Sequence, residues 1–521
     1  MSESINTNAE PITLDPTHAA FDAHSTIADL GRTHFIGIGG AGMSVLAEML
    51  HERGVNVDGS DRESGPKTDR LQSLGIAVEF GQRADNVQDA HTIVYSSAIK
   101  PDNPEIVAAY QAGEHIVHRS DILALLMNDR RAVTVAGAHG KTTTSSLLAH
   151  ILVHVGEGEL ADPSYAIGGS IQAPDGATLD GGHAGHGSVL VAEADESDGS
   201  FEKYRPEIAI ITNAEADHLD HYGTEANYCA AFVEYAGHAR DRIIMSGDDE
   251  GARAVLSALP ADVAARTIVT TTSSAQSFGG THGATLVVIS SESEQAESGV
   301  EQFSMRIPAV LSADGVDKTL MVRLAIPGIH NARNAAGAIL AAMLLGVDLS
   351  AAAKAASSFL GAARRFQVCG EVGGITVVDD YAHHPTEIAA LLHAARRRYP
   401  HAAIRVLFQP HLFSRTKFFA SEFAQALSLA DDVIVTGIYP ARERQEDFPD
   451  ISARTIVDEA PEKSHAADWI SAVNDMHVAA EMLVMRANPG DVIFTVGAGD
   501  ITTMTQVMLH ALAARCSAGE R

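Results

Sequence analysis

The stretch Gly137-Ala138-His139-Gly140-Lys141-Thr142-Thr143-Thr144 decides the fold of the central part of this chain. An apolar, β-branched run over 132–136 precedes it, and an apolar-patterned stretch over 145–153 follows it. A glycine-rich turn between a strand and a helix offers backbone N–H groups and the positive helix end to phosphate oxygens. A lysine there neutralises phosphate charge, and a threonine hydroxyl reaches Mg²⁺. The pattern predicts a P-loop-type phosphate site, shorter than the common form because Val135 replaces its first glycine.

Strand-like runs alternate with helical stretches from His34 onward, which is typical of parallel sheets. They predict an α/β protein of three domains over 31–127, 128–359 and 360–521, after a disordered tail over 1–30 that lacks periodicity. Residues of about 155–187 are expected to be a loop or an insertion, and 273–325 to add antiparallel strands to the central sheet. The predicted strands are 34–38, 55–59, 92–96, 132–136, 188–192, 208–212, 242–246, 375–378, 404–408, 433–436 and 492–496.

Composition narrows the class of function. A formal net charge of −30 argues against binding to nucleic acid or to anionic membranes, which need basic surfaces. The three cysteines are widely spaced and odd in number, which favours a reducing compartment. Residues 1–28 lack the features of a signal peptide, and the longest apolar stretch, 335–347, is too short to cross a bilayer. We therefore expect a cytoplasmic protein without membrane insertion.

A second glycine-rich turn lies near the amino terminus. Gly37, Gly39, Gly40 and Gly42 form G-x-G-x-x-G between a predicted strand and helix, and Asp61 follows near the end of the next strand. This fingerprint allows a diphosphate to approach the backbone. By itself it fits an NAD-dependent dehydrogenase, a protein that binds a nucleotide-sugar diphosphate, or a tight turn without a ligand.

Two acidic clusters follow strands of the central series, over 193–198 and 212–220. The carboxyl ends of parallel strands meet at one ligand edge, where the Lys141 loop also lies. Carboxylates there can hold Mg²⁺, which prefers oxygen ligands and bridges substrate phosphates. Glu193 and His218 are the strongest candidates for functional residues in the two clusters.

Together these motifs resemble the Mur ligases, ATP-dependent amide-forming enzymes of peptidoglycan precursor synthesis. The resemblance rests on the phosphate loop, the two acidic clusters and Gly328-Ile-His-Asn-Ala-Arg-Asn-Ala335, and it extends over about 30–510. Further motifs resemble the branch that joins L-alanine to UDP-N-acetylmuramate: 37–44, 96–99, 379–387 and 496–500. Leu412 is one departure, because some members carry arginine at that position.

The resemblance implies an N-terminal Rossmann-like domain for the UDP substrate, a central ATP-binding domain and a C-terminal dinucleotide-fold-like domain that closes over the site. It implies catalytic roles for Lys141, Glu193, His218, Arg365 and His383, and ligands of Mg²⁺ in Thr142, Glu193 and His218. Contacts with ATP are implied for Gly137, His139, Gly140, Lys141, Thr142, Thr143, His330, Asn331, Asn334, Arg365 and Asp380. Contacts with the other substrates are implied for Gly37, Gly39, Gly40, Gly42, Met43, Ser44, Asp61, Ser96, Ser97 and Arg415.

The implied reaction activates a carboxylate by phosphorylation, and an amine then displaces phosphate from the acyl phosphate. Alternatives remain open: a sister ligase that adds a tripeptide, a glutamate-adding folate ligase, an NAD-dependent oxidoreductase, or a non-catalytic nucleotide-binding regulator. We expect small-molecule substrates, no nucleic-acid partner, and a monomer or weak homodimer.

Overall fold

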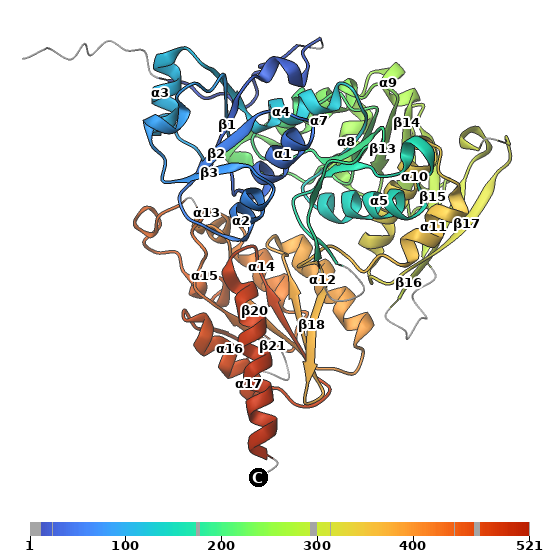
Figure 1. The fold of residues 1–521 in the computed structure, drawn as a ribbon. Coiled ribbons are helices and arrows are strands. Elements are labelled where there is room, and N and C mark those ends of the chain that lie inside the picture. Colours follow the sequence, from blue (N-terminus) through green and yellow to red (C-terminus); the bar gives the residue numbers. More distant parts are fainter. Residues whose placement is uncertain are drawn as a thin grey trace, which may run out of the picture.

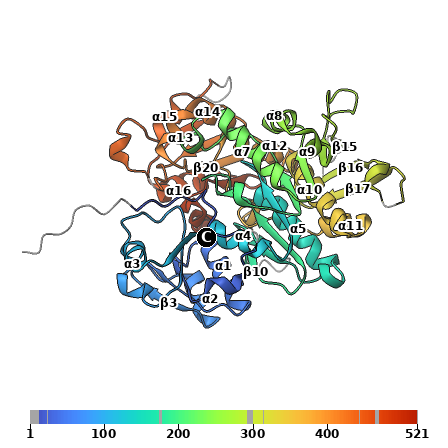
Figure 2. The ribbon, with the colours of Figure 1, turned by 90° about the horizontal axis from the view of Figure 1, so that it is seen from above.

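The computed structural model describes residues 12–22, 24–172, 178–291, 300–312, 314–441, 443–462 and 469–519. Three sheets follow one another along the chain, and the domains built on them surround a common centre (Figure 1, Figure 2). The first sheet has the order β3-β2-β1-β4-β5, with every pair parallel. Its strands are β1 (Thr33–Ile36), β2 (Val57–Asp61), β3 (Ala77–Phe80), β4 (Thr92–Tyr95) and β5 (His115–His118). Its helices are α1 (Ala41–Glu52), α2 (Pro66–Ser73), α3 (Pro104–Ala112) and α4 (Arg119–Met127).

The segment before β1 corrects the prediction of a disordered tail. Ile12 and Leu14 pack against the apolar cluster beside α3, and Phe21 packs on the main core of this domain. The Ala20 N–H also donates to Asp121. The prediction is therefore wrong for 12–22 and 24–30, and its remainder, residues 1–11 and 23, lies outside the described residues.

The central sheet has ten strands in the order β10-β7-β11-β6-β12-β13-β14-β15-β16-β17. The run from β7 to β15 is parallel, whereas β10, β16 and β17 pair antiparallel with their neighbours. The core strands are β6 (Arg131–Ala136), β11 (Val189–Glu193), β12 (Ile208–Ile211), β13 (Arg242–Ser246) and β14 (Thr267–Thr271). The outer strands are β7 (Ser164–Ala166), β10 (Gly182–His183), β15 (Thr285–Ser291), β16 (Glu301–Ile307) and β17 (Lys318–Leu324). A separate pair consists of β8 (Ile171–Gln172) and β9 (Thr178–Leu179).

Helices α5 (Lys141–Val155) and α10 (Ile329–Leu345) share a buried apolar cluster with the central strands, as do residues of α11 (Leu349–Ser357). The stretch 335–347 is thus buried mainly within α10, as predicted. The other helices of this domain are α6 (Leu219–Tyr222), α7 (Glu225–His238), α8 (Glu250–Ala258) and α9 (Ala261–Ala265). One apolar cluster continues from the N-terminal domain into the central domain, through residues such as Leu123, Phe201 and Phe232. These two domains therefore share a core.

The C-terminal sheet has the order β18-β19-β23-β20-β21-β22, parallel except for the β18–β19 pair. Its strands are β18 (Gln367–Val372), β19 (Ile375–Asp380), β20 (Ile404–Phe408), β21 (Asp432–Val435), β22 (Ile470–Ala472) and β23 (Val492–Val496). Its helices are α12 (Pro385–Arg398), α13 (Phe413–Phe418), α14 (Ala420–Leu427), α15 (Ala453–Val457), α16 (Met476–Arg486) and α17 (Met504–Gly519). Two apolar clusters of its own lie on the two faces of this sheet. Polar contacts such as Arg397–Glu301 and Thr386–Glu215 join the domain to the central one.

The predicted three-domain α/β fold is confirmed, and each predicted strand lies within about two residues of an observed one. The segment 273–325 contributes β15 to β17; β16 and β17 are the expected antiparallel strands, whereas β15 joins the sheet parallel to β14. Of the two alternatives for 155–187, a loop is wrong for β7 and β10, which extend the central sheet. The seams near 128 and 360 fall between the sheets, and we propose them as domain boundaries. Among the described helices, none combines the length and the hydropathy needed to cross a bilayer.

Candidate active site

The turn between β6 and α5 packs too closely against the end of β12 and against α10 for side chains at its two glycines. Gly137 has φ +133°, and a Cβ there would lie 2.2 Å from Thr212 Oγ1. Gly140 has φ +86°, and a Cβ there would lie 2.7 Å from Asn334 Oδ1. The end of β12 fixes the turn, because Thr212 Oγ1 and Asn213 Nδ2 both donate to the His139 carbonyl, at 2.5 and 2.7 Å. The first N–H groups of α5 have no intrahelical acceptor by geometry, so they remain available to an anion.

Lys141 begins α5 and is held inside the site. Its Nζ lies 2.9 Å from both carboxylate oxygens of Glu196 and 2.7 Å from the Gly137 carbonyl. Burial lowers the pKa of Lys141, but the carboxylates of Glu196 and Asp195 outweigh it and raise the pKa overall. The ammonium therefore stays charged, next to the turn that is shaped for phosphate.

Candidate ligands of Mg²⁺ lie on the same side of the turn. Glu193 ends β11, and its Oε1 accepts from the Gly168 N–H at 3.0 Å. Thr142 is in the first turn of α5, and His218 caps α6 in a left-handed conformation with φ +53°. All three line one cavity. A carboxylate and a hydroxyl facing a phosphate turn fit the oxygen preference of Mg²⁺; His218 supplies a nitrogen, 3.7 Å from Asp217.

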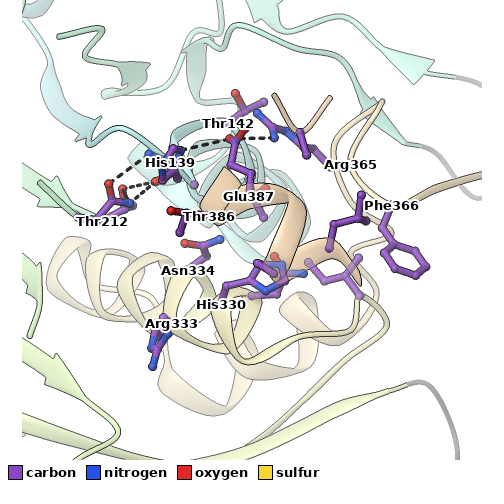
Figure 3. Close-up of a pocket in the computed structure, with 18 of the residues that line it drawn as sticks. His139, Thr142, Thr212, His330, Arg333, Asn334, Arg365, Phe366, Thr386 and Glu387 are labelled. Carbon is purple, nitrogen blue, oxygen red and sulfur yellow. Dashed lines mark hydrogen bonds and ion pairs between the residues drawn. The ribbon is translucent and has the colours of Figure 1, made fainter. Parts of the chain in front are cut away.

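The first of two cavities, about 300 Å³, lies between α5, α10 and the C-terminal domain (Figure 3). It collects most of the residues predicted to contact ATP: His139, Gly140, Thr142, Thr143, His330, Asn331, Asn334, Arg365 and Asp380. Burial raises the pKa of Asp380 to about 6, although Arg365 opposes this, and the carboxylate accepts from two backbone N–H groups. Burial lowers the pKa of His330 to about 4, so its ring is neutral near pH 7.

The second cavity, about 920 Å³, lies where the three domains meet. Its N-terminal wall includes the predicted Gly40, Gly42, Met43, Ser44 and Ser96, its central wall Lys141, Glu193 and His218, and its C-terminal wall Arg365 and His383. The two cavities share His139, Gly140, Thr142, Arg365 and Glu387. Two ligands bound in them would therefore meet beside the phosphate turn.

Six predicted site residues do not line either cavity: Gly37, Gly39, Asp61, Ser97, Gly137 and Arg415. Several of them make hydrogen bonds or ion pairs with residues next to the cavities. Asp61 accepts from the Gly39 N–H at 2.8 Å, and Ser97 donates to Asp198. Arg415 lies 3.2 Å from Asp217, which lines the larger cavity.

Several cavity residues were missed by sequence reasoning. Arg119, the first residue of α4, is 3.0 Å from Asp195 and reaches the larger cavity from the N-terminal domain. Glu387 of α12 lies between His139, at 3.3 Å, and Arg365, at 3.5 Å (Figure 3). Lys67 and Arg70 of α2 also line the larger cavity. Each is a charged residue on a helix, a signal too common to single it out.

A phosphate turn with a charged lysine, a neighbouring carboxylate and hydroxyl that would suit Mg²⁺, and a cavity walled by three domains are typical of a nucleotide-dependent enzyme that joins two ligands. Comparison with known proteins agrees with this class. Models of the Mur ligase family match over 32–131 (catalytic domain), 135–342 (middle domain) and 364–499 (glutamate ligase domain). The chain belongs to the Mur ligase family.

Individual members of the family are similar over nearly the whole chain. The chain is 72% identical over 508 residues to the UDP-N-acetylmuramate–L-alanine ligase of Bifidobacterium adolescentis, covering 97% of both chains. It is 41% identical to the enzyme of that name in Streptomyces coelicolor, over 93% of this chain and 98% of the relative. The crystal structure of UDP-N-acetylmuramate–alanine ligase from Thermotoga maritima superposes with a TM-score of 0.71 at 28% identity, covering 93% of this chain and 99% of that one.

Proposed function

We propose that this chain is an ATP-dependent ligase that joins the amino group of L-alanine to the carboxylate of UDP-N-acetylmuramate. The observation that carries the proposal is 72% identity, over 97% of both chains, to a relative named for this reaction. The geometry agrees, since the cavity walled by all three domains meets the nucleotide cavity at the Lys141 turn. The reaction belongs to peptidoglycan precursor synthesis, which supports a cytoplasmic location and small-molecule partners.

The nucleotide and the UDP substrate are assigned to different cavities. The turn over 137–143 and the start of α10 would hold ATP in the smaller cavity, with Arg365 and Asp380 added from the C-terminal domain. The glycine turn of the N-terminal domain would hold the UDP substrate, which accounts for that fingerprint without NAD. Met43, Ser44 and Ser96 lie on the same wall.

The chemistry needs alignment and charge neutralisation more than a protein nucleophile. The γ-phosphoryl group passes from ATP to the carboxylate, giving an acyl phosphate and ADP. The neutral amine attacks the carbonyl carbon, phosphate leaves with the electrons of the broken C–O bond, and the amine loses a proton. Lys141 and Arg365 neutralise charge that develops on the transferred group.

Thr142 and Glu193 would hold Mg²⁺, which when bound neutralises phosphate charge. His218 is assigned to its support. His383 is the candidate that assists loss of the proton from the amine, because its ring faces the substrate cavity beside Glu387, 3.2 Å away.

Closure of the C-terminal domain would keep water from the acyl phosphate. The contacts that support closure are polar and cross between domains, such as Arg415 with Asp217 and Thr386 with Glu215. The N-terminal and central domains share an apolar core instead. The C-terminal domain is therefore assigned as the moving body.

Product analysis tests the assignment. The protein is incubated with ATP, Mg²⁺, UDP-N-acetylmuramate and an equimolar mixture of L-alanine and the L-alanyl tripeptide of the sister ligase. Mass spectrometry is expected to show addition of one alanyl residue only. Exclusive addition of the tripeptide would move the chain to the sister activity, and a change in absorbance at 340 nm with NAD would indicate an oxidoreductase.

A further inference from the structure

A cluster of two histidines and a carboxylate lies beside the nucleotide cavity, apart from Thr142 and Glu193. One ligand atom from each of His139, Glu215 and His384 lies within 4.8 Å of the other two. His139 comes from the phosphate turn, Glu215 from the loop after β12, and His384 from the residue that precedes α12. The cluster thus draws on two domains. Its side chains are mostly withdrawn from solvent, with exposed fractions of 15%, 35% and 5% respectively.

The buried ring of His384 has no hydrogen-bond partner among the described residues, at either nitrogen. Leaving such a polar group unmatched costs about 1–3 kcal/mol. The ring packs against His139, with centroids 5.0 Å apart, and its Nδ1 lies 4.0 Å from Glu215 Oε1. An unmatched nitrogen aimed at a carboxylate and a second imidazole is the arrangement that a cation would complete.

Both ring nitrogens of His139 likewise lack a hydrogen-bond partner among the described residues, although carboxylates lie close to each of them. Nε2 of His139 faces Glu215 at 3.3 Å, while Nδ1 faces Glu387 Oε1, also at 3.3 Å. A metal-binding histidine commonly donates its second ring N–H to a carboxylate, which fixes the ring and raises its basicity. Thr386 Oγ1 donates to Glu215 Oε1 at 2.7 Å, so this carboxylate is fixed as well. Figure 3 shows His139, Thr386 and Glu387 converging from the two domains.

We propose that His139, Glu215 and His384 form a binding site for a transition-metal dication such as Zn²⁺, oriented by Glu387 and Thr386. Two imidazoles and one carboxylate suit Zn²⁺, Co²⁺ or Fe²⁺, whereas Mg²⁺ prefers oxygen ligands. Because the ligands come from the central and C-terminal domains, the site is complete only when these domains are closed on each other. A bound metal would then hold the phosphate turn to α12.

In the metal-free protein a proton can take the place of the cation. Burial lowers the pKa of His139, but Glu387 and Glu215 outweigh it and raise the pKa to about 9. An imidazolium between two carboxylates is thus the competing occupant of the same cluster. Direct measurement of metal binding distinguishes a bound metal ion from a bound proton.

The test uses the full-length chain without a histidine tag, in excess Mg²⁺ so that the oxygen ligands near Thr142 are occupied. ZnCl₂ is titrated by calorimetry, and the bound metal is counted by elemental analysis after dialysis. We expect one tight equivalent of Zn²⁺. His384→Ala and Glu215→Gln should each weaken it at least about 10–100-fold, the scale seen even for residues that only support metal ligands.

His393→Ala is the matched control, because His393 is an exposed histidine on the same helix, α12. It should bind Zn²⁺ as the wild type does. Circular dichroism verifies that each variant is folded, and Glu215→Gln changes one carboxylate oxygen without changing the shape of the side chain. The proposal is overturned if the wild type binds no Zn²⁺ tightly, or if His384→Ala and Glu215→Gln both bind Zn²⁺ as tightly as the wild type does.

Discussion

Replacing Lys141 by alanine should affect stability and catalysis by separable routes. The ammonium contacts both oxygens of Glu196, whose side chain is 0% exposed. Removing one partner of a buried ion pair costs about 3–5 kcal/mol, because the other charge remains buried without compensation. For a domain of this size each kcal/mol lowers the midpoint of thermal unfolding by about 2–4 °C. We expect a fall of roughly 6–20 °C for the central domain in Lys141→Ala.

The stability deficit should depend on pH with a definite sign. Burial raises the pKa of Glu196 above 4.5 even beside the ammonium, and removing Lys141 raises it further. A carboxyl whose folded-state pKa is raised stabilises the fold while protonated, and this contribution is lost as the pH rises. The deficit of Lys141→Ala should therefore grow between about pH 5 and pH 8. Adding Glu196→Gln should restore most of the stability and remove this pH dependence.

Catalysis should not recover in the double variant. Loss of one charge that stabilises the transferred phosphoryl group costs about 10²–10³ in kcat, or about 2.7–4 kcal/mol. The assays are urea unfolding at the two pH values and phosphate release at saturating substrates. Turnover restored in the double variant, or a single variant as stable as the wild type, would refute the assigned role of Lys141.

Three further predictions concern the metal, the nucleotide cavity and the amino-acid side. Chelation by EDTA should abolish turnover, and added Mg²⁺ should restore it. Glu193→Gln should raise the half-saturating Mg²⁺ concentration roughly 10–100-fold. A Mg²⁺ titration of this variant that matches the wild type would contradict the assignment of Glu193 to the metal site. Because burial raises the pKa of Asp380 to about 6, its ionised form costs stability above that pH. Urea unfolding should show Asp380→Asn gaining on the wild type by roughly 1.4 kcal/mol as the pH rises from about 5 to 8, whereas a difference that does not change with pH would contradict this. Arg415→Ala removes the ion pair with Asp217, which lines the larger cavity. It should raise KM for L-alanine about ten- to a hundredfold, the scale of a lost charged hydrogen bond, and raise KM for ATP less; equal increases in both KM values would contradict a role on the amino-acid side.

Much of the fold could be predicted because its central strands are apolar, β-branched runs that are buried on both faces. The run over 132–136 is an example, since residues 132–136 of β6 are all buried. The short strands β7 and β10 lack such a run, and they are fixed by pairing beside β11 and with each other. The segment before β1 was missed because a few side chains without periodicity, such as Ile12 and Phe21, attach it.

The site residues also fall into two groups: those that the sequence could predict and those that it could not. Residues of the phosphate turn and of α10 belong to local motifs, so the sequence alone indicates their chemistry. The structure brings them to one cavity. Glu387, Glu215 and Arg119 instead gain their roles from partners on other elements, often in another domain. No local pattern encodes such pairings. Asp61 and Ser97 belong to such local motifs as well, and in the structure they hydrogen-bond to Gly39 and Asp198 without lining either cavity.

Transfer of oxygen from the substrate carboxylate to phosphate tests the central claim most directly. UDP-N-acetylmuramate labelled with ¹⁸O in its carboxylate is turned over with ATP, Mg²⁺ and L-alanine, and the released phosphate is analysed by mass spectrometry. Attack of the amine on an acyl phosphate predicts one labelled oxygen in each phosphate released and none in ADP. Unlabelled phosphate, or label recovered in AMP, would contradict phosphorylation of the carboxylate at the Lys141 turn.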